Sequence, residues 1–570
     1  MPAVNGITSR PCAAAAAGLL LIGLLAPPVA HARCPAASHT VAEVRGTTPQ
    51  VSIGDAVAVR GIVTGDFRGD DGLRGFFLQS REPTADGLPR AVFVFTPDMV
   101  ADDGDFGPGS EVLVRGQAAE HRDRPQIGWV DDVQVCAEPG LPAPVELALP
   151  AADRDDWHRL EGVKIGIDDP LTVTGNFQLA RFGTLDLAID GRLFRPTQFA
   201  DTSGADHDAR RLLLDDASYA RQPRPVPYLD GEGTRRVGSV VPHLTGILTH
   251  AFGNWRVHPV APDELAFAAA NPRPEPPSRA SGTVRIAGFN VENYFLTLGE
   301  RGAADESALA QQRSQLGAVV AGLQPDVLGL VEVENDPRAV DDLVGRLGKA
   351  AGRGSGFRHF VINGPVGNDA IRTVLAWDPE VVEVLGGPYI DRDEIHHRPP
   401  VAGHFRLRDG GPGTLVVAIH HKAKSGCPDS GDIDRGQGCW NELRIEQSRA
   451  LARFLARKQE QLGTSRVLIV GDVNAYGAED PVILLRETGY RDLLKQLPRE
   501  RRYTYVFRGE SGSLDSALAT TALITDVVAA DTWAINADEP AALHEFTTVG
   551  GPWRLSDHDP VIVDLRGGPE

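Results

Sequence analysis

The chain contains 570 residues, of which 42% are apolar and 24% are charged, and its formal net charge is −20. This length exceeds one ordinary hydrophobic core, so we expect roughly two to four domains, and the composition excludes extended disorder as the main state. The negative charge excludes a protein that holds a polyanion by bulk attraction, although it leaves room for cations gathered at one site.

Residues 1–32 predict a secretory signal peptide. Arg10 precedes an apolar run at residues 13–26, and residues 30–32 form a small-x-small cleavage pattern. The run is shorter than the ~20 residues of a membrane-spanning helix and no later stretch replaces it, so we expect no stable membrane association. A lipid anchor is disfavoured because the first retained cysteine is not preceded by the small residues that lipid processing requires. We therefore expect a secreted, extracellular protein, with the periplasm as the alternative.

Four of the five cysteines remain after signal cleavage. An even number of cysteines in an exported protein predicts disulfides, and four cysteines allow three pairings. We favour the two local pairs, because Cys34 and Cys136 bracket one N-terminal region while Cys427 and Cys439 flank one polar loop. A zinc site is disfavoured because the sequence has no CxxC pair.

The N-terminal part is expected to be rich in strands. Apolar residues alternate with polar ones at residues 57–63 and 112–116, and Gly- and Asp-rich turns separate such segments. A second strand-rich part follows, and its residues 244–249 echo residues 59–64, either as a weak internal repeat or as a pattern common in β proteins. We expect one β domain at residues 33–145 and a second at residues 146–270.

Residues 271–282 predict a linker and the main domain boundary. The segment Asn271–Pro277 contains four prolines, which fix φ and favour a stiff, extended chain. Beyond it, apolar strands alternate with helices, and functional groups are expected where strands end and loops begin. We expect strands at residues 284–289, 327–331, 414–419 and 467–470, helices at residues 306–322, 339–350 and 443–460, and one layered domain over residues 283–568.

Six segments of this last region place polar or ionisable side chains at or just after a strand or a turn. They are residues 289–293 (FNVEN), 330–335 (LVEVEN), 419–424 (IHHKAK), 471–474 (GDVN), 513–516 (SLDS) and 556–560 (SDHDP). This set, in this order, resembles the endonuclease/exonuclease/phosphatase superfamily, and most closely its bacterial extracellular nucleases. The resemblance implies an α+β fold, a four-layered α/β sandwich of two packed, mostly antiparallel sheets flanked by helices, with a cleft at one edge.

The first β domain resembles the OB-fold-like module that precedes the catalytic domain in those nucleases. Barrels of this type bind single strands through stacking aromatics and a basic groove. Five side chains could supply such a face, with the alternative that the aromatic ones among them fill a small barrel: Phe67, Arg68, Arg74, Phe76 and Phe77.

The family resemblance assigns a metal to two strand-end residues. Asn290 and Glu332 supply the hard oxygen atoms that Mg²⁺ prefers, with Mn²⁺ and Ca²⁺ as alternatives. Asp557 resembles a further carboxylate of the family, on the metal side or beside the catalytic histidine.

The same resemblance assigns the catalytic roles. Asp472 and Asn474 follow a buried strand one residue apart and so share a face, where the family positions water and contacts the scissile phosphate. His558 matches the catalytic histidine, because imidazole exchanges protons near neutral pH, and Asp515 would orient it. His420 aligns with the second histidine of the site; His421 is its alternative, since strand alternation lets only one of them face the cleft.

Four cations are candidates for contact with substrate, with solvated surface charges as the alternative: Arg372, Arg398, Lys422 and Lys424. The loop between Cys427 and Cys439 carries three aspartates, Asp429, Asp432 and Asp434, which either bind calcium or form a solvated acidic loop. A cysteine-closed loop at this place is typical of the extracellular nucleases.

Taken with the signal peptide, the resemblance implies a secreted, metal-dependent phosphodiester hydrolase. Its expected partner is nucleic acid, with DNA favoured and RNA as the alternative, and endonucleolytic cleavage is favoured over exonucleolytic. A phospholipid or inositol-phosphate phosphodiesterase or phosphatase on the same scaffold is the first rival. The second rival is an inactive secreted nucleic-acid-binding or adhesion protein. The sequence leaves the oligomeric state open.

Overall fold

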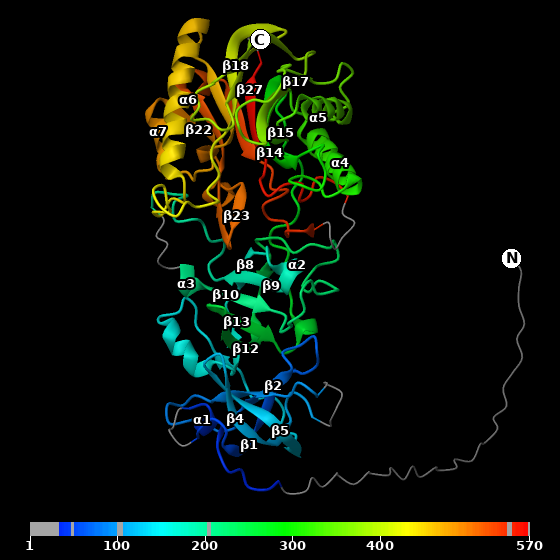
Figure 1. The fold of residues 1–570 in the computed structure, drawn as a ribbon, viewed down its shortest axis with the longest axis vertical. Coiled ribbons are helices and arrows are strands. Elements are labelled where there is room, and N and C mark those ends of the chain that lie inside the picture. The colour runs from blue at the N-terminus through cyan, green and yellow to red at the C-terminus, as the bar shows by residue number, and fades with distance from the viewer. Residues whose placement is uncertain (1–33, 47–50, 100–105, 202–206, 544–549, 568–570) are drawn as a thin grey trace, which may run out of the picture.

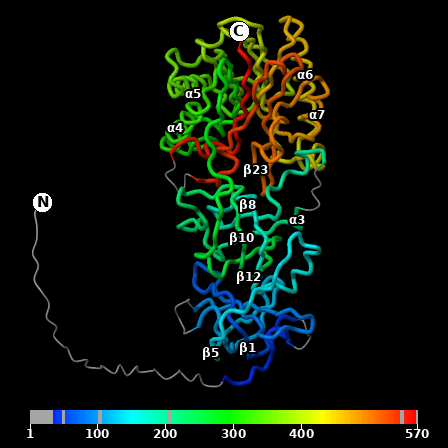
Figure 2. Tube along the Cα trace, turned by 180° about the vertical axis from the view of Figure 1, so that it is seen from behind, coloured from blue at the N-terminus to red at the C-terminus, as the bar shows by residue number. Residues whose placement is uncertain are grey.

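The computed structural model describes residues 34–46, 51–99, 106–201, 207–543 and 550–567. Three regions follow one another along the longest axis, with the N-terminal region at one end and the C-terminal region at the other (Figure 1). The view from behind shows the same order (Figure 2). The predicted signal peptide at residues 1–32 lies outside the described residues.

The N-terminal region is a closed five-stranded barrel next to one short helix. Its elements are α1 (Val41–Val44), β1 (Ala56–Phe67), β2 (Gly75–Gln79), β3 (Ala91–Phe95), β4 (Glu111–His121) and β5 (Arg124–Ala137). The strand order is β1-β2-β3-β5-β4, and β4 closes onto β1. The predicted strands at residues 57–63 and 112–116 are confirmed within β1 and β4.

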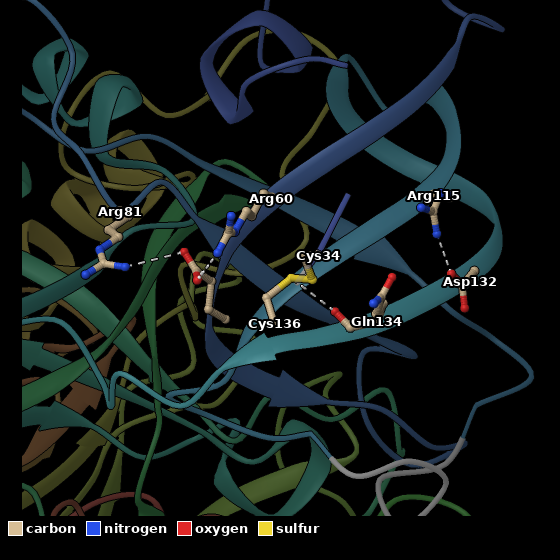
Figure 3. Close-up of a disulfide and its surroundings, with 8 residues drawn as sticks. Cys34, Arg60, Arg81, Arg115, Asp132, Gln134 and Cys136 are labelled. Carbon is tan, nitrogen blue, oxygen red and sulfur yellow. Dashed lines mark hydrogen bonds and ion pairs between the residues drawn. A yellow bond between two sulfur atoms is a disulfide. The ribbon is translucent and has the colours of Figure 1, made fainter. Parts of the chain in front are cut away.

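Both predicted disulfides are present. Cys34, the first described residue, is bonded to Cys136 of β5 and so ties the segment before α1 to the barrel (Figure 3). Cys427 is bonded to Cys439 and closes the polar loop of the C-terminal region.

The side chains considered for a single-strand-binding face are mostly part of the barrel itself. Phe76 is fully buried and Phe77 nearly so. The guanidinium of Arg68 is buried, donates to both carboxylate oxygens of Asp66 at 2.8 and 2.7 Å, and lies over the ring of Phe106. These contacts favour the alternative in which Arg68, Phe76 and Phe77 are part of the barrel, whereas Arg74 is exposed and the Phe67 ring centroid lies 5.7 Å from that of His258 in the middle region.

The middle region is built on one eight-stranded sheet. Its strands are β6 (Val145–Glu146), β7 (Lys164–Ile167), β8 (Leu171–Gly175), β9 (Thr184–Ala188), β10 (Arg211–Asp215), β11 (Val240–Val241), β12 (Leu244–Ala251) and β13 (Asn254–Pro259), and its short helices are η1 (Arg154–Leu160), α2 (Leu179–Phe182), α3 (His207–Arg210) and η3 (Pro262–Glu264). The order is β11-β8-β9-β10-β13-β12-β7-β6. The segment that echoes β1 is β12, so the two similar segments belong to different sheets.

The C-terminal region contains two six-stranded sheets. The strands of the first are β14 (Thr283–Tyr294), β15 (Val327–Glu334), β16 (Arg358–His359), β17 (Ile371–Trp377), β26 (Val527–Thr532) and β27 (Val561–Arg566); those of the second are β18 (Val382–Ile390), β19 (Val401–Leu407), β20 (Gly410–His420), β21 (Val467–Asp472), β22 (Tyr490–Asp492) and β25 (Asp515–Thr520). In each sheet one central pair is parallel, β14 with β15 and β20 with β21. The other neighbours are antiparallel.

Helices cover the outer faces of the two sheets. In Figure 1, α4 (Glu306–Leu323) and α5 (Pro337–Ala350) lie on one side, and α6 (Asn441–Leu462) and α7 (Asp480–Glu487) lie on the other. The three predicted helices are confirmed as α4, α5 and α6, each with ends close to those expected. The shorter elements are η4 (Leu493–Gln496), η5 (Arg499–Arg501), α8 (Thr521–Ile524) and the hairpin of β23 (Tyr505–Phe507) with β24 (Glu510–Gly512).

Alternation along the central strands builds the layers. In β21, Leu468 and Val470 pack between the two sheets, whereas Val467 and Ile469 pack against α6 and α7. Apolar residues of β15 pack in the same alternating way toward α4 and α5. Because successive strand residues face opposite sides, one apolar run serves both the inner and the outer layer. The predicted fold class is confirmed: two packed, mostly antiparallel sheets flanked by helices, preceded by β-rich regions.

Two neighbouring acids in the loop after β26 tie the C-terminal region to the middle region. Asp538 and Glu539, which we call the interface acid pair, are 0% and 1% exposed. Asp538 accepts hydrogen bonds from Arg192 at 2.9 Å and from Tyr503 at 2.7 Å. Glu539 accepts one from Arg236 at 2.5 Å. Since buried carboxylates are stable only when paired, this interface is a fixed contact.

The predicted linker packs along the same interface. Arg273 donates two hydrogen bonds to Glu539, at 3.0 and 2.9 Å. Arg285 of β14 donates to the carbonyl oxygen of Pro277 at 2.9 Å. The linker is therefore held at several points and does not act as a free spacer. In the part of the chain that the structure describes, no helix is long and apolar enough to cross a membrane.

Candidate active site

Two glycines let the sheets approach closely at the end where the candidate residues lie. A Cβ atom on Gly288 would come within 2.9 Å of the Val470 Cβ, and one on Gly329 would come within 2.9 Å of the Val470 Cγ2. Distances under 3.0 Å are closer than side-chain carbons tolerate, so larger residues would force the sheets apart. This close packing brings the end of β14 next to the end of β21.

The predicted metal ligands lie together at these strand ends. Asn290 Nδ2 is 3.1 Å from Glu332 Oε1 and 3.5 Å from Asp472 Oδ2. The Asn290 side chain is buried, while that of Glu332 is 18% exposed and so reaches solvent. The structure thus brings the two predicted ligands into contact with each other and with Asp472.

Unusual backbone conformations aim these side chains. Glu332 has φ +66° and Asn474 has φ +52°, in the left-handed region that non-glycine residues rarely adopt. Glu332 also lies where the pairing of β15 with β17 shifts register, between Leu330 and Val333. Bulges re-aim side chains, and left-handed residues cost of order 1–3 kcal/mol each, so strain is concentrated at this edge.

His558 and Asp515 form a buried pair. His558 Nδ1 lies 2.8 Å from Asp515 Oδ2, and Thr504 Oγ1 donates to the same oxygen at 2.7 Å. Burial alone would lower the pKa of His558, but the charges of Asp515, Asp557 and Asp472 raise it well above its ordinary value. These charges favour the protonated form of the imidazole.

Asp557 lies on the other side of this ring. Its Oδ1 is 3.8 Å from His558 Nε2, and its side chain is 36% exposed. The sequence left two roles open for Asp557, on the metal side or beside the catalytic histidine. Its position next to His558 favours the second role. A place at the metal remains a prediction.

Asp472 and Asn474 face the same cluster. Asp472 Oδ1 accepts from the Asn474 backbone N–H at 2.6 Å, and Asn474 Nδ2 donates to Asp472 Oδ2 at 3.0 Å. One ligand atom each from Asp472, Asp515 and His558 lie within 4.8 Å of one another. Burial raises the pKa of Asp472 to about 7; the Asp515 charge adds to this rise and the His558 charge opposes it.

His420 is the histidine that faces the cluster. Its Nε2 is 3.5 Å from Asp472 Oδ2 and 3.8 Å from Glu332 Oε1, and Arg398 Nη1 approaches it at 2.7 Å. Burial and the charge of Arg398 lower the pKa of His420 well below its ordinary value, so the ring is neutral. His421 turns away, with its Nε2 3.2 Å from Ser448 Oγ.

Of the four predicted substrate-binding cations, Arg398 contacts the cluster, through His420. Lys424 Nζ instead donates to the Gln437 carbonyl oxygen at 2.6 Å and pairs with Glu479, and its pKa is lowered to about 8, mainly by burial. Arg372 is buried and donates to the carbonyl oxygen of Gly364 at 3.3 Å.

Lys422 holds its ammonium 5.3 Å from the centroid of the Trp440 ring. Among the described contacts, Arg372, Lys422 and Lys424 stay outside the cluster, and their binding of substrate remains a prediction.

The acidic loop is organised by its own backbone. Asp432 accepts from the backbone N–H groups of Glu442 and Leu443, at 3.1 and 2.9 Å, and so caps α6. Asp434 accepts from the backbone N–H groups of Gly436 and Gly438, at 2.8 and 2.9 Å. These bonds favour a structural role over calcium binding.

Three residues near the cluster were not singled out from the sequence. Glu292 lies two residues after Asn290 on the same strand, and alternation alone could have identified it. Thr504, which donates to Asp515, and Tyr505, whose ring centroid is 4.8 Å from that of His558, belong to or adjoin the hairpin strand β23. No periodic pattern marks that hairpin.

The donor atoms of the cluster fit a hard divalent cation. Glu332 and Asp472 offer carboxylate oxygens; the amide oxygen of Asn290 accepts from the Glu292 backbone N–H at 3.0 Å, while its Nδ2 faces the two carboxylates. Asp515 Oδ1 is buried and, among the described residues, has no hydrogen-bond partner. A cation would satisfy this oxygen and offset the mutual repulsion of the carboxylates, which is one cause of the raised pKa of Asp472.

Comparison with known proteins identifies this region further. Residues 287–558 match the model of the Endonuclease/Exonuclease/phosphatase family, which supports a domain of that family in the C-terminal half of the chain. The family name covers nucleases and phosphatases, so the match leaves the substrate open. The comparison with curated proteins found no match.

Several solved structures are similar over half of the chain. The human Nocturnin catalytic domain with bound sulfate is 14% identical, covers 50% of this chain and 95% of its own, and has a TM-score of 0.35. D. rerio TDP2 complexed with a single-strand DNA product is 17% identical, covers 50% and 99%, and scores 0.33. A mannosyl-6-phosphatase from Bacteroides thetaiotaomicron is 16% identical, covers 50% and 99%, and scores 0.34.

Proposed function

We propose that the endonuclease/exonuclease/phosphatase domain makes this chain a secreted, divalent-metal-dependent phosphodiesterase that cleaves DNA internally and also accepts RNA. One observation carries the proposal. Acidic, amide and imidazole groups that are distant in the sequence converge at adjoining strand ends, with Asp472, Asp515 and His558 within 4.8 Å of one another. Phosphodiester hydrolysis needs an activated water, neutralisation of charge and stabilisation of the departing oxygen, and these groups can supply each of them.

Asn290 and Glu332 would hold the cation, with Asp557 as the further carboxylate on the metal side, and Mg²⁺ is the best fit for their oxygens, with Mn²⁺ and Ca²⁺ as alternatives. When bound, the cation would supply neutralisation of the negative charge on the attacked phosphate and on the oxygen that departs as its bond to phosphorus breaks.

The protein's own side chains would orient the water, transfer protons and add positive charge at the phosphate. Asp472 and Asn474 orient the attacking water, and the Asp472 carboxylate accepts its proton. His558, protonated and held by Asp515, donates to a phosphate oxygen. Arg398 brings a permanent positive charge to the same phosphate.

The upstream regions favour a polynucleotide over a lipid or an inositol phosphate. The order of the closed barrel, with β3 and β5 parallel, supports an OB-like module at residues 33–145. Residues 146–270 would form a second β domain, joined through the linker at residues 271–282 to the catalytic domain at residues 283–568. Export is supported by the two disulfides and by the signal-like residues 1–32.

The proposal is tested by a panel of phosphoesters incubated with purified protein and Mg²⁺. Closed circular DNA, linear DNA, RNA and bis(p-nitrophenyl) phosphate represent the proposed class; phospholipid vesicles and inositol phosphates represent the rival class. We expect nicking of closed circles, which only an endonuclease can produce. Hydrolysis of phospholipid or inositol phosphate without cleavage of DNA would reverse the assignment. A protein that binds DNA but hydrolyses none of these phosphoesters would favour the binding or adhesion alternative.

A further inference from the structure

An aromatic side chain of the middle region lines a cavity beside the candidate active site. The cavity has a volume of about 450 Å³, and its walls include Glu292 and Asn293 of β14 and Phe177 of the loop between β8 and α2. Figure 1 shows β8 and α2 at the end of the middle region that faces the C-terminal region. Because Glu292 is two residues from Asn290, the cavity opens next to the proposed cation-binding side of the site.

Phe177 is exposed although its backbone is held firmly. Its side chain is 67% exposed. The preceding Asn176 is buried and donates through Nδ2 to the carbonyl oxygens of Arg235 at 2.9 Å and Asp538 at 2.8 Å. The side-chain amide of Asn176 thus ties the loop that carries Phe177 to the middle region through Arg235 and to the C-terminal region through Asp538. A large apolar ring held in water by a buried anchor contributes little to packing, which points to a role in binding.

Two guanidinium groups line the same cavity on the side of the active site. Arg301 donates to Asn293 Oδ1 at 2.7 Å and to Asp369 Oδ1 at 3.2 Å, and the other Asp369 oxygen is 3.8 Å from Arg398. Arg301 is thereby linked to the cation that approaches His420.

Arg554 lies on the loop that leads to His558. It donates to the carbonyl oxygens of Asn536 and Ser556, at 3.3 and 3.2 Å. Asn536 in turn donates to the carbonyl oxygen of His558 at 2.6 Å. The cavity is therefore lined by two guanidinium groups, which lie beside the carboxylate of Glu292.

We infer that this cavity binds the nucleotide next to the attacked phosphate, with its base stacked on Phe177 and its backbone phosphate between Arg301 and Arg554. An aromatic platform beside guanidinium groups is the arrangement that binds single strands without sequence readout. A single ring suits one base, whereas an acyl chain would need a continuous apolar wall. The inference rests on the proposed function and deepens it: since a base must leave its stack to meet the ring, the preferred substrate is single-stranded or locally opened.

The test compares four variants on two oligonucleotides of equal length, one with bases and one with abasic residues throughout. Phe177→Ala and Phe177→Leu remove the ring, and Phe177→Tyr keeps it. Phe252→Ala is the matched control, because Phe252 is a 75% exposed phenylalanine of the same region outside this cavity. Steady-state kinetics give kcat and KM for each, and bis(p-nitrophenyl) phosphate reports the core chemistry.

We expect Phe177→Ala and Phe177→Leu to raise KM for the base-containing strand about 5- to 150-fold, the range for lost base–aromatic stacking. KM for the abasic strand and kcat on the small diester should not change, and Phe177→Tyr and Phe252→Ala should match the wild type. Equal losses on both strands would overturn the inference and assign Phe177 a structural role, as would no loss on either. Hydrolysis of the small diester with neither strand cleaved would refute the proposed polynucleotide substrate, and the inference with it.

Discussion

At the residue scale, the state of His558 depends on the carboxylate beside it. Asp515 Oδ2 accepts from His558 Nδ1, which fixes the orientation of the ring and leaves Nε2 on the side of Asp557. Replacing Asp515 with Asn would leave a similar shape without the charge. We therefore expect kcat on bis(p-nitrophenyl) phosphate to fall about 10²- to 10⁴-fold with little change in KM.

Thr504 should affect kcat less than Asp515 does, because it acts on His558 only through its hydrogen bond to Asp515. Thr504→Val removes the hydroxyl that donates to Asp515, and a loss near one hydrogen bond predicts a fall in kcat of roughly fivefold to tenfold. Thr249→Val is the control, because it removes a comparable hydroxyl contact to His258 at 2.9 Å in the middle region. If Asp515→Asn kept wild-type kcat, the histidine would not act in the proposed way.

Asp216, in the middle region, should make the free energy of unfolding depend on pH, independently of the candidate active site. Burial, reinforced by the charge of Asp215, raises its pKa from the ordinary 3.8 to about 7. Below pH 3.8 the carboxyl is protonated in both folded and unfolded chains, and above pH 7 it is ionised in both. Between these values only the unfolded chain is ionised, so the stability that Asp216 contributes at low pH is lost as pH rises toward 7.

Asp216→Asn removes this loss while keeping an oxygen that can accept from the Ser218 N–H. The variant should be more stable than the wild type by about 1–3 kcal/mol at pH 8, after allowance for its partial exposure, and nearly equal at pH 4. Urea unfolding at both pH values measures the difference, with exposed Asp169→Asn as the control. A gain that is the same at pH 4 and pH 8 would show that charge is not its cause.

At the element scale, the strands that carry the site were predictable and the loops that hold it were not. The apolar runs of β15 and β21 predict buried strands. The polar residues that follow each run predict where the strand ends. Asp305 is the N-cap of helix α4, and its side chain accepts from the Ala308 N–H; an aspartate at this place is a capping signal that the sequence shows. The segment with the interface acid pair has no periodicity, and its partners Arg192 and Arg236 lie more than 300 residues earlier.

The interface acid pair should be important for both stability and activity. Arg236→Met leaves Glu539 and Asp538 with fewer cationic partners in a buried setting, so we expect a loss of about 3–5 kcal/mol in urea unfolding. Activity should fall as well, because Asn536 of the same loop bonds the carbonyl oxygen of His558.

Arg435→Ala provides the comparison, since it breaks the exposed ion pair with Glu442 and should cost less than about 1 kcal/mol. An Arg236→Met variant as stable and as active as the wild type would mean that the two regions are not mechanically joined at this contact.

At the scale of the whole molecule, a chain with a net charge of −20 gathers a few fixed cations where a polyanion would be attacked. Arg398 faces the cluster, and Arg301 and Arg554 line the adjoining cavity. The net charge predicted that the chain does not hold a polyanion by overall electrostatic attraction. The motifs separately predicted the four-layered sandwich fold with a cleft at one edge. The place of Phe177 could not be predicted, because it depends on how the middle region docks, and docking is set by side-chain pairs that have no local sequence pattern.

The most direct test of the account is the nicking of closed circular DNA by metal-free protein to which Mg²⁺ is returned in steps. The wild type should be inert with EDTA and recover as Mg²⁺ is added; Glu332→Gln should need at least about tenfold more Mg²⁺, and His558→Ala should lose about 10²- to 10⁴-fold in rate at saturating Mg²⁺. Cleavage that persists in excess EDTA, or that is unaffected by both substitutions, would contradict the account.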